Sequence, residues 1–134
     1  MIEPGRAATL THTVTHADLA SAHARDAGER YPDVLSTPAL LSLIERACAD
    51  VLRDVVGEGQ LSVGVTTHLN HLAPTPLGAD VSATATFRDI DGALYWFDVV
   101  ASDALGPVGT GSHARAIVER AAIEARAAKR RRAE

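Results

Sequence analysis

The clearest element in the pattern of hydrophobic and polar positions is a helix from Thr37 to about Val56. Thr37 suits its N-cap, Pro38 suits the first helical position, and the glycines at 57 and 59 end it. Hydrophobic side chains recur in this segment at steps of three and four residues, as on one face of an α-helix. This apolar stripe is formed by Leu40, Leu41, Ile44, Ala47, Cys48, Val51, Leu52 and Val55.

Alternation of apolar and polar residues predicts strands on both sides of this helix. A threonine-rich strand at 8–15 precedes it, and 16–36 is irregular, with room for a short helical turn after Asp18. Four more strands are predicted at 61–73, 79–88, 93–102 and 107–118. In the first of these four, most apolar residues hold odd-numbered positions, so we expect the odd face to be buried. Asp91-Gly92 predicts a hairpin, and the alanine- and arginine-rich residues 120–132 predict a helical or frayed tail.

One long apolar helix and strands joined by short turns indicate an α+β domain, with the helix packed on an antiparallel sheet of about five strands. We expect residues 1–119 to form this single domain and residues 120–134 to form a basic C-terminal helix or tail. Because one helix covers only half of such a sheet, we also expect at least a dimer.

Composition narrows the class of protein. The 134 residues are 46% hydrophobic, which fits one domain with a real core. The net charge of -4 gives no general attraction to nucleic acid or anionic membranes, although seven of the thirteen basic residues lie between Arg115 and Arg132. The single cysteine, Cys48, excludes an internal disulfide. No secretory signal or membrane span is apparent, so we expect a cytoplasmic protein.

Two polar residues interrupt the apolar pattern. Glu45 lies on the apolar stripe of the helix, where a carboxylate is rare unless it is paired or used in chemistry. An edge position that reaches solvent, or a structural hydrogen bond, explains it about equally well. His71 shares strand parity with Leu69 and points toward the layer of the helix, although a lone inward histidine is more often a satisfied core residue. If the two side chains meet, they form an acid–base pair.

Thr37 is a third candidate, because a helix N-terminus offers free N–H groups and the positive end of the helix dipole to an oxyanion. Its predicted role as N-cap already explains the residue. The other histidines lack the spacing of a metal site, and Gly109-Thr110-Gly111 lacks the lysine and the following helix of a phosphate-binding loop. We therefore expect no bound metal.

Together these segments resemble the hotdog-fold thioesterases related to fluoroacetyl-CoA thioesterase. The resemblance runs from about Tyr31 to the end of the chain, and the spacings between its stretches also match. The stretches are Val34-Leu35-Ser36-Thr37 through Glu45-Arg46-Ala47-Cys48, Ser62-Val63-Gly64 through His71, and Gly109-Thr110-Gly111-Ser112-His113-Ala114-Arg115-Ala116.

The resemblance implies a hotdog fold, acyl-CoA thioester hydrolysis without a separate cofactor, and a homodimer with acyl-CoA at the subunit interface. It implies that Thr37, Glu45 and His71 form the catalytic set. It also implies that Gly64 lies beside the thioester carbonyl and Arg115 near the active site.

Tyr31 departs from the family, which has a phenylalanine gate at this position. The tyrosine hydroxyl changes the polarity of the pocket, so we expect an acyl group other than fluoroacetyl. The basic residues from Lys129 to Arg132 could contact the CoA phosphates, although a solvated end is the commoner fate of such a charge run.

Two alternatives remain from the sequence. A hotdog protein can bind acyl-CoA without hydrolysing it, because fold does not fix function. A hotdog hydratase uses Asp-x4-His, a spacing that Asp18 and His23 share, but the surrounding glycine and asparagine pattern of that motif is missing.

Overall fold

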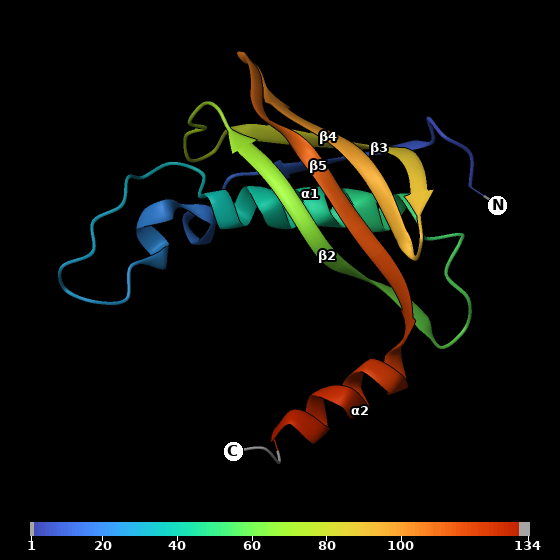
Figure 1. Ribbon diagram of the computed structural model, residues 1–134. Coiled ribbons are helices and arrows are strands. Elements are labelled where there is room, and N and C mark those ends of the chain that lie inside the picture. Colours follow the sequence, from blue (N-terminus) through green and yellow to red (C-terminus); the bar gives the residue numbers. More distant parts are fainter. Residues whose placement is uncertain (1, 132–134) are drawn as a thin grey trace.

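A curled antiparallel sheet of five strands wraps partly around one long helix (Figure 1) in the computed structural model, which describes residues 2–131. The strands lie in the order β1-β3-β4-β5-β2, so β1 and β2 form the two edges. The predicted α+β arrangement is confirmed. Along the chain the elements are β1 (Ala7–Thr13), two 3-10 helices (His16–Asp18 and Ala20–His23), α1 (Thr37–Val51), β2 (Gln60–His71), β3 (Asp80–Asp91), β4 (Leu94–Asp103), β5 (Gly106–Glu119) and α2 (Arg120–Arg131).

The core lies between the apolar face of α1 and the concave face of the sheet. Alternate residues of β3, from Val81 to Phe87, are buried, which confirms the alternation predicted for this strand. Phe87 packs edge-on against Phe97 of β4 with 5.9 Å between ring centroids. Cys48 is fully buried on α1, and burial raises the pKa of its thiol to about 12. The buried face of α1 consists of Leu40, Leu43, Ile44, Ala47, Cys48 and Val51.

Both ends of α1 differ from the prediction. The N-cap is Ser36, whose Oγ accepts a hydrogen bond from the Ala39 N–H at 3.1 Å, so Thr37 is already the first helical residue and its hydroxyl is not used as the cap. The helix ends at Val51, earlier than predicted, with Leu52 as C-cap. Leu52 is fully buried in the turn that follows, so apolar character beyond Val51 reflects burial and not helical structure.

The predicted odd face of β2 is correct only for half of the strand. The register against β5 shifts between Gly64 and Thr66, which leaves Val65 in a β-bulge with 53% of its surface exposed. One inserted residue exchanges the two faces of a strand. Gly64 therefore faces α1 before the bulge, and Leu69 and His71 face it after the bulge.

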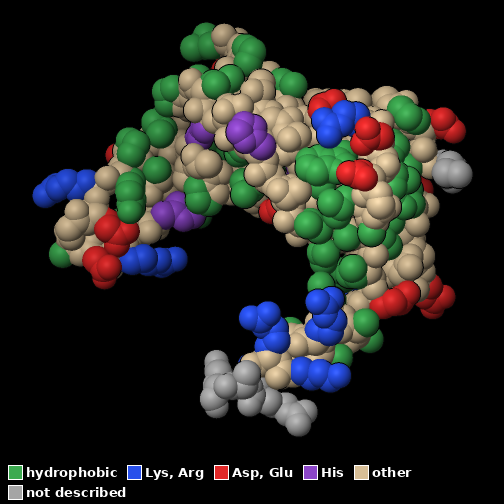
Figure 2. All heavy atoms as spheres, viewed as in Figure 1, with side chains coloured by type: hydrophobic (Ala, Val, Ile, Leu, Met, Phe, Trp, Pro, Cys, Tyr) green, Lys and Arg blue, Asp and Glu red, His purple; other side chains and the backbone are tan. Residues whose placement is uncertain are grey.

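The chain continues from β5 into α2, which projects away from the sheet and has no buried residue (Figure 1). Basic side chains gather on this helix, whereas acidic side chains lie mainly on the rest of the chain (Figure 2). Residues 132–134 of the predicted tail lie outside the described residues, and the division into a domain and a tail stays a prediction. Neither described α-helix is long and apolar enough to cross a membrane.

Candidate active site

The first polar cluster joins the start of α1 to the end of β2. Thr37 Oγ1 lies 2.8 Å from His71 Nδ1, a hydrogen bond between residues 34 positions apart. Burial is the main influence on the His71 pKa and lowers it, so the imidazole is neutral at pH 7. The sequence prediction that His71 points toward the helix layer is confirmed by this contact.

The second ring nitrogen of His71 is free. Nε2 is buried and has no hydrogen-bond partner among the described residues. When the Thr37 hydroxyl donates to Nδ1, the ring hydrogen lies on Nε2, and when Nδ1 donates, Nε2 is an acceptor. An unpaired buried polar atom is costly in a folded protein, and here it belongs to the side chain best suited to proton transfer near neutral pH.

The second cluster surrounds Glu45, further along α1. Glu45 Oε1 lies 3.5 Å from Arg115 Nη1 and 4.0 Å from His113 Nε2. Gly64 of β2 faces the same carboxylate so closely that a Cβ there would overlap Glu45 Oε1. The missing side chain at position 64 therefore lets the carboxylate lie directly on the strand backbone.

Arg115 is held in place by β2 and β5. Its Nε donates to Ser62 Oγ and its Nη2 to the Ser62 carbonyl, both at 2.9 Å, and its Nη1 donates to His113 Nε2 at 3.1 Å. Burial lowers the Arg115 pKa and the Glu45 carboxylate opposes this change. A guanidinium nevertheless stays protonated in proteins, so Glu45 faces a fixed positive charge.

His113 supports this arrangement as a neutral ring. Because arginine has only donors, His113 Nε2 must accept, and Nδ1 carries the hydrogen that is donated to Thr67 Oγ1 at 2.6 Å. Burial, followed by the Arg115 charge, lowers the His113 pKa.

The structure brings the predicted site residues together in two groups. Thr37 meets His71, and Glu45 meets Gly64 and Arg115. Glu45 and His71, which the sequence analysis expects to meet if they form an acid–base pair, do not contact each other within one chain. Thr37 and Glu45 are eight residues apart on α1, which corresponds to about 12 Å along the helix axis.

Comparison with known proteins identifies the family. The family described as FlK, fluoroacetyl-CoA-specific thioesterase, matches residues 14–121. The chain belongs to this family. The resemblance inferred from the sequence is thereby confirmed, and the FlK family is one of thioester hydrolases, as predicted.

Individual relatives agree with the FlK assignment. A fluoroacetyl-CoA thioesterase from Streptantibioticus cattleyicolor is 32% identical over 88 residues, which cover 66% of this chain and 63% of that protein. The chain thus spans somewhat less than two thirds of this relative's length in the match.

Solved structures establish the hotdog fold. A crystal structure of a mutant of the fluoroacetyl-CoA-specific thioesterase FlK has a TM-score of 0.88 and 25% identity, covering 97% of this chain and 98% of the other. A hot-dog-like protein from Thermanaerovibrio acidaminovorans has a TM-score of 0.82 and 29% identity, covering 95% and 91%. The predicted hotdog fold is confirmed.

Tyr31, which the sequence analysis expects to change the polarity of the acyl pocket, lies beside the first cluster. Tyr31 and Thr37 line the same open pocket of about 330 Å³, together with His23 and Ser36. The Tyr31 hydroxyl donates to Glu29 Oε1 at 2.9 Å, and 47% of the residue's surface is exposed. A hydroxyl oxygen that already donates its hydrogen still offers lone pairs as acceptors, so this pocket has polar as well as apolar walls.

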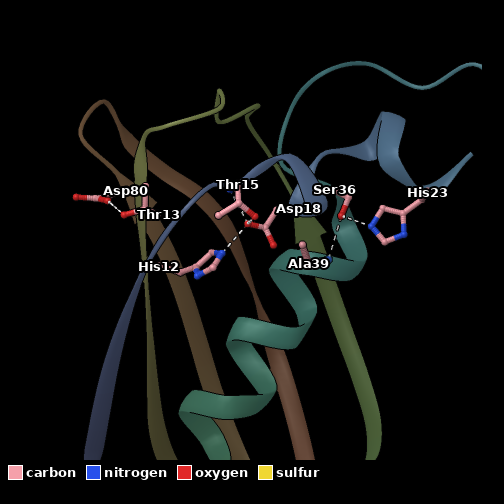
Figure 3. Close-up of polar contacts among 8 residues, drawn as sticks. All are labelled: His12, Thr13, Thr15, Asp18, His23, Ser36, Ala39 and Asp80. Carbon is pink, nitrogen blue, oxygen red and sulfur yellow. Dashed lines mark hydrogen bonds and ion pairs between the residues drawn. The ribbon is translucent and has the colours of Figure 1, made fainter.

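The two residues with hydratase spacing do not form a pair in this FlK-family chain (Figure 3). Asp18 Oδ2 contacts His12 Nε2 at 2.6 Å and accepts from the Thr15 N–H at 2.7 Å. His23 Nε2 instead lies 3.2 Å from the Ser36 hydroxyl at the start of α1. Both residues therefore hold the segment that leads into α1.

The sequence analysis missed the residues that orient Arg115, namely Ser62, Thr67 and His113. One signal was available for His113, because residues two apart on a strand share a face, which places His113 beside Arg115. The contacts from β2 depend on the bulge and could not be predicted. No group of three or more His, Cys, Asp or Glu side chains within residues 2–131 could hold a metal ion, and the absence of a cofactor stays a prediction.

Proposed function

We propose that this FlK-family protein hydrolyses the thioester of a small acyl-CoA, with Thr37, Glu45 and His71 as its catalytic residues. The main support is the Thr37–His71 hydrogen bond, beside which the buried Nε2 of the same imidazole has no partner within residues 2–131. The curated relative is itself a fluoroacetyl-CoA thioesterase.

In the proposed reaction, Glu45 either attacks the thioester carbonyl carbon or removes a proton from an attacking water. The carbon–sulfur bond breaks, and the CoA sulfur takes a proton delivered through His71. Hydrolysis by water yields the free acid and CoA. Arg115 holds the Glu45 carboxylate in position, while Thr37 orients His71 at the positive end of the α1 dipole.

The separation of the two clusters supports a site built from two chains, and we propose a homodimer. β2 is a long edge strand whose outer backbone groups need partners. An antiparallel pairing of the two β2 strands runs the Gly64 region of one strand past the His71 end of its partner. Gly64 and His71 both face the α1 side of the sheet. The partner's His71 then lies near Glu45.

For the acyl group, we propose a substrate other than fluoroacetyl, because the hydroxyl of Tyr31 lines the pocket next to Thr37. CoA enters as part of the substrate, so the reaction needs no separate cofactor. One buried cysteine and no predicted disulfide suit the reducing cytoplasm.

The test is CoA release from a panel of short, hydroxylated and aromatic acyl-CoAs. We expect at least one thioester to be cleaved, and Glu45→Gln or His71→Ala to lower kcat/KM by about 10²-fold or more. Tight acyl-CoA binding without release of CoA would identify a non-catalytic binding protein. Unchanged hydrolysis in both variants would exclude the proposed residues.

Mixing Glu45→Gln and His71→Ala chains tests the two-chain site. In a mixed dimer one site contains both substitutions and the other contains neither, if the site draws Glu45 and His71 from different chains. Since half of randomly formed dimers are mixed, about a quarter of wild-type activity returns. A site within one chain recovers none, which would refute the shared site.

A further inference from the structure

Charge is divided unevenly between α2 and the rest of the chain. Residues 2–119 contain seven basic and fifteen acidic side chains, whereas α2 contains five basic residues and one acidic residue. None of the ion pairs among residues 2–131 involves α2. An isolated excess of positive charge on an otherwise acidic protein favours an anionic ligand.

Three of the five basic residues of α2, namely Arg126, Lys129 and Arg130, lie on one face of the helix. Arg126 and Arg130 are four residues apart and so lie on the same side of the helix, one turn from each other. They line a shallow surface hollow together with Lys129, and Ile123 and Ala127 form its apolar part. A surface that combines guanidinium groups with a small apolar patch suits phosphates attached to a flat ring, because guanidinium binds phosphate by paired hydrogen bonds and stacks on rings.

The position of α2 relative to the Glu45–Arg115 cluster also limits which ligands could contact both. Arg120 follows Arg115 by five positions on or next to β5, which corresponds to about 17 Å of strand. The twelve residues of α2 span about 18 Å along a helix that turns away from the direction of β5 (Figure 1). Figure 2 shows an open hollow between α2 and the body of the chain, with basic side chains along the helix. The ligand must therefore carry its negative charge far from its reacting group.

We propose that α2 binds the phosphates of coenzyme A, with Arg126, Lys129 and Arg130 as the contacting side chains. This inference rests on the proposed function only in taking acyl-CoA as substrate. In CoA the pantetheine arm separates the thioester from the pyrophosphate and the 3′-phosphate, and the adenine ring lies at the phosphate end. The chemistry of CoA thus matches both the charge and the distance.

The test compares Arg126→Gln/Arg130→Gln with the control Arg6→Gln/Arg88→Gln. The control removes two exposed basic groups that pair with acids elsewhere on the surface. We expect the α2 variant to raise KM for the acyl-CoA roughly tenfold at low ionic strength, with kcat unchanged. The KM for the same acyl group on N-acetylcysteamine, which carries no phosphate, stays at the wild-type value. High salt removes the difference between variant and wild type.

Calorimetric titration with CoA itself makes the test independent of catalysis. A weaker CoA affinity in the α2 variant alone supports the inference even if no thioester is hydrolysed. Equal affinity in wild type and α2 variant overturns it. An equal loss in both variants also overturns it, because the effect then reflects net charge and not α2. Gel-shift binding of nucleic acid by α2 with unchanged CoA affinity would assign the helix to another ligand.

Discussion

Gly64 determines where the carboxylate of Glu45 can lie. A methyl group at position 64 would overlap Glu45 Oε1 and approach His113 Cε1 to 3.2 Å. Glu45 is the flexible partner, since 40% of its side chain is exposed, so it would swing away with little loss of stability.

We therefore expect Gly64→Ala to lower kcat/KM by about 10²-fold, as expected for a displaced reacting group, while the free energy of unfolding changes by less than about 1 kcal/mol. Thiol-release kinetics and denaturant unfolding measure the two effects. Gly28→Ala is the matched control, because a Cβ at position 28 meets open space. A large loss of stability in Gly64→Ala would mean that the residue serves the fold and not the carboxylate.

His113 makes stability depend on pH. Burial and the Arg115 charge lower its pKa from the ordinary value of 6.5, while Glu45 raises it. As the pH falls through about 6.5, the unfolded chain therefore binds a proton at His113 that the folded chain does not bind. The free energy of unfolding decreases as the pH drops below this value.

Melting temperatures measured between pH 7.5 and pH 5 should decrease, and less steeply in His113→Gln than in the wild type. Some slope remains in the variant, because burial also lowers the pKa of His71. Parallel curves for the two proteins would contradict a neutral, buried His113.

At this scale the sequence predicted the unusual residues better than their partners. Glu45 and His71 were identified because polar side chains interrupted apolar faces. Their partners came from other elements, and contacts such as Thr37 with His71 depend on how strands and helix are placed in space. A face assigned by parity was right for His71 and wrong for Gly64, because the bulge at Val65 gives no signal in the sequence.

At the scale of elements, the start of α1 divides two tasks between neighbouring residues. Ser36 caps the helix through its contact with the Ala39 N–H, and Thr37 keeps its hydroxyl for His71. Ser36→Ala should cost about 1 kcal/mol and lower Tm by about 3–6 °C. Thr37→Ala should leave Tm within about 2 °C and lower kcat/KM by about tenfold or more. Calorimetry and thiol release distinguish the two, and the reverse pattern would restore Thr37 as the cap.

The existence of every strand and helix could be predicted, but their ends could not. Periodicity identifies which residues are buried, but not whether they belong to a helix. Leu52 lies in the turn after Val51 and is as fully buried as the core residues of α1. Ser36 and Thr37 are adjacent and both residue types cap helices, so the sequence alone could not show which of them is the N-cap. Helix termini are therefore set by hydrogen bonds that the apolar pattern does not contain.

At the scale of the molecule, the order of the strands in the sheet could not be predicted from the sequence. Short turns predicted that the four strands after α1 are consecutive neighbours. This is right for β3, β4 and β5 and wrong for β2, which does not pair with β3 but joins β5 at an edge of the sheet. The family resemblance predicted the hotdog fold as a whole but not this strand order.

Truncation after Glu119 tests the predicted domain limit. Since α2 buries none of its residues, residues 1–119 should fold with Tm within about 3 °C of the full chain and should cleave the N-acetylcysteamine thioester at a similar rate. Circular dichroism melts and thiol release check this. An insoluble or unfolded product would make α2 part of the folding unit.

The burial of Cys48 has a practical consequence for measuring the proposed activity. The only protein thiol lies within the core with a pKa of about 12, so a disulfide reagent used to count released CoA does not react with the native chain. The colour that develops then comes from product alone. Under denaturant the same reagent reacts with one thiol per unfolded chain, so its rate of reaction reports how often α1 separates from the sheet.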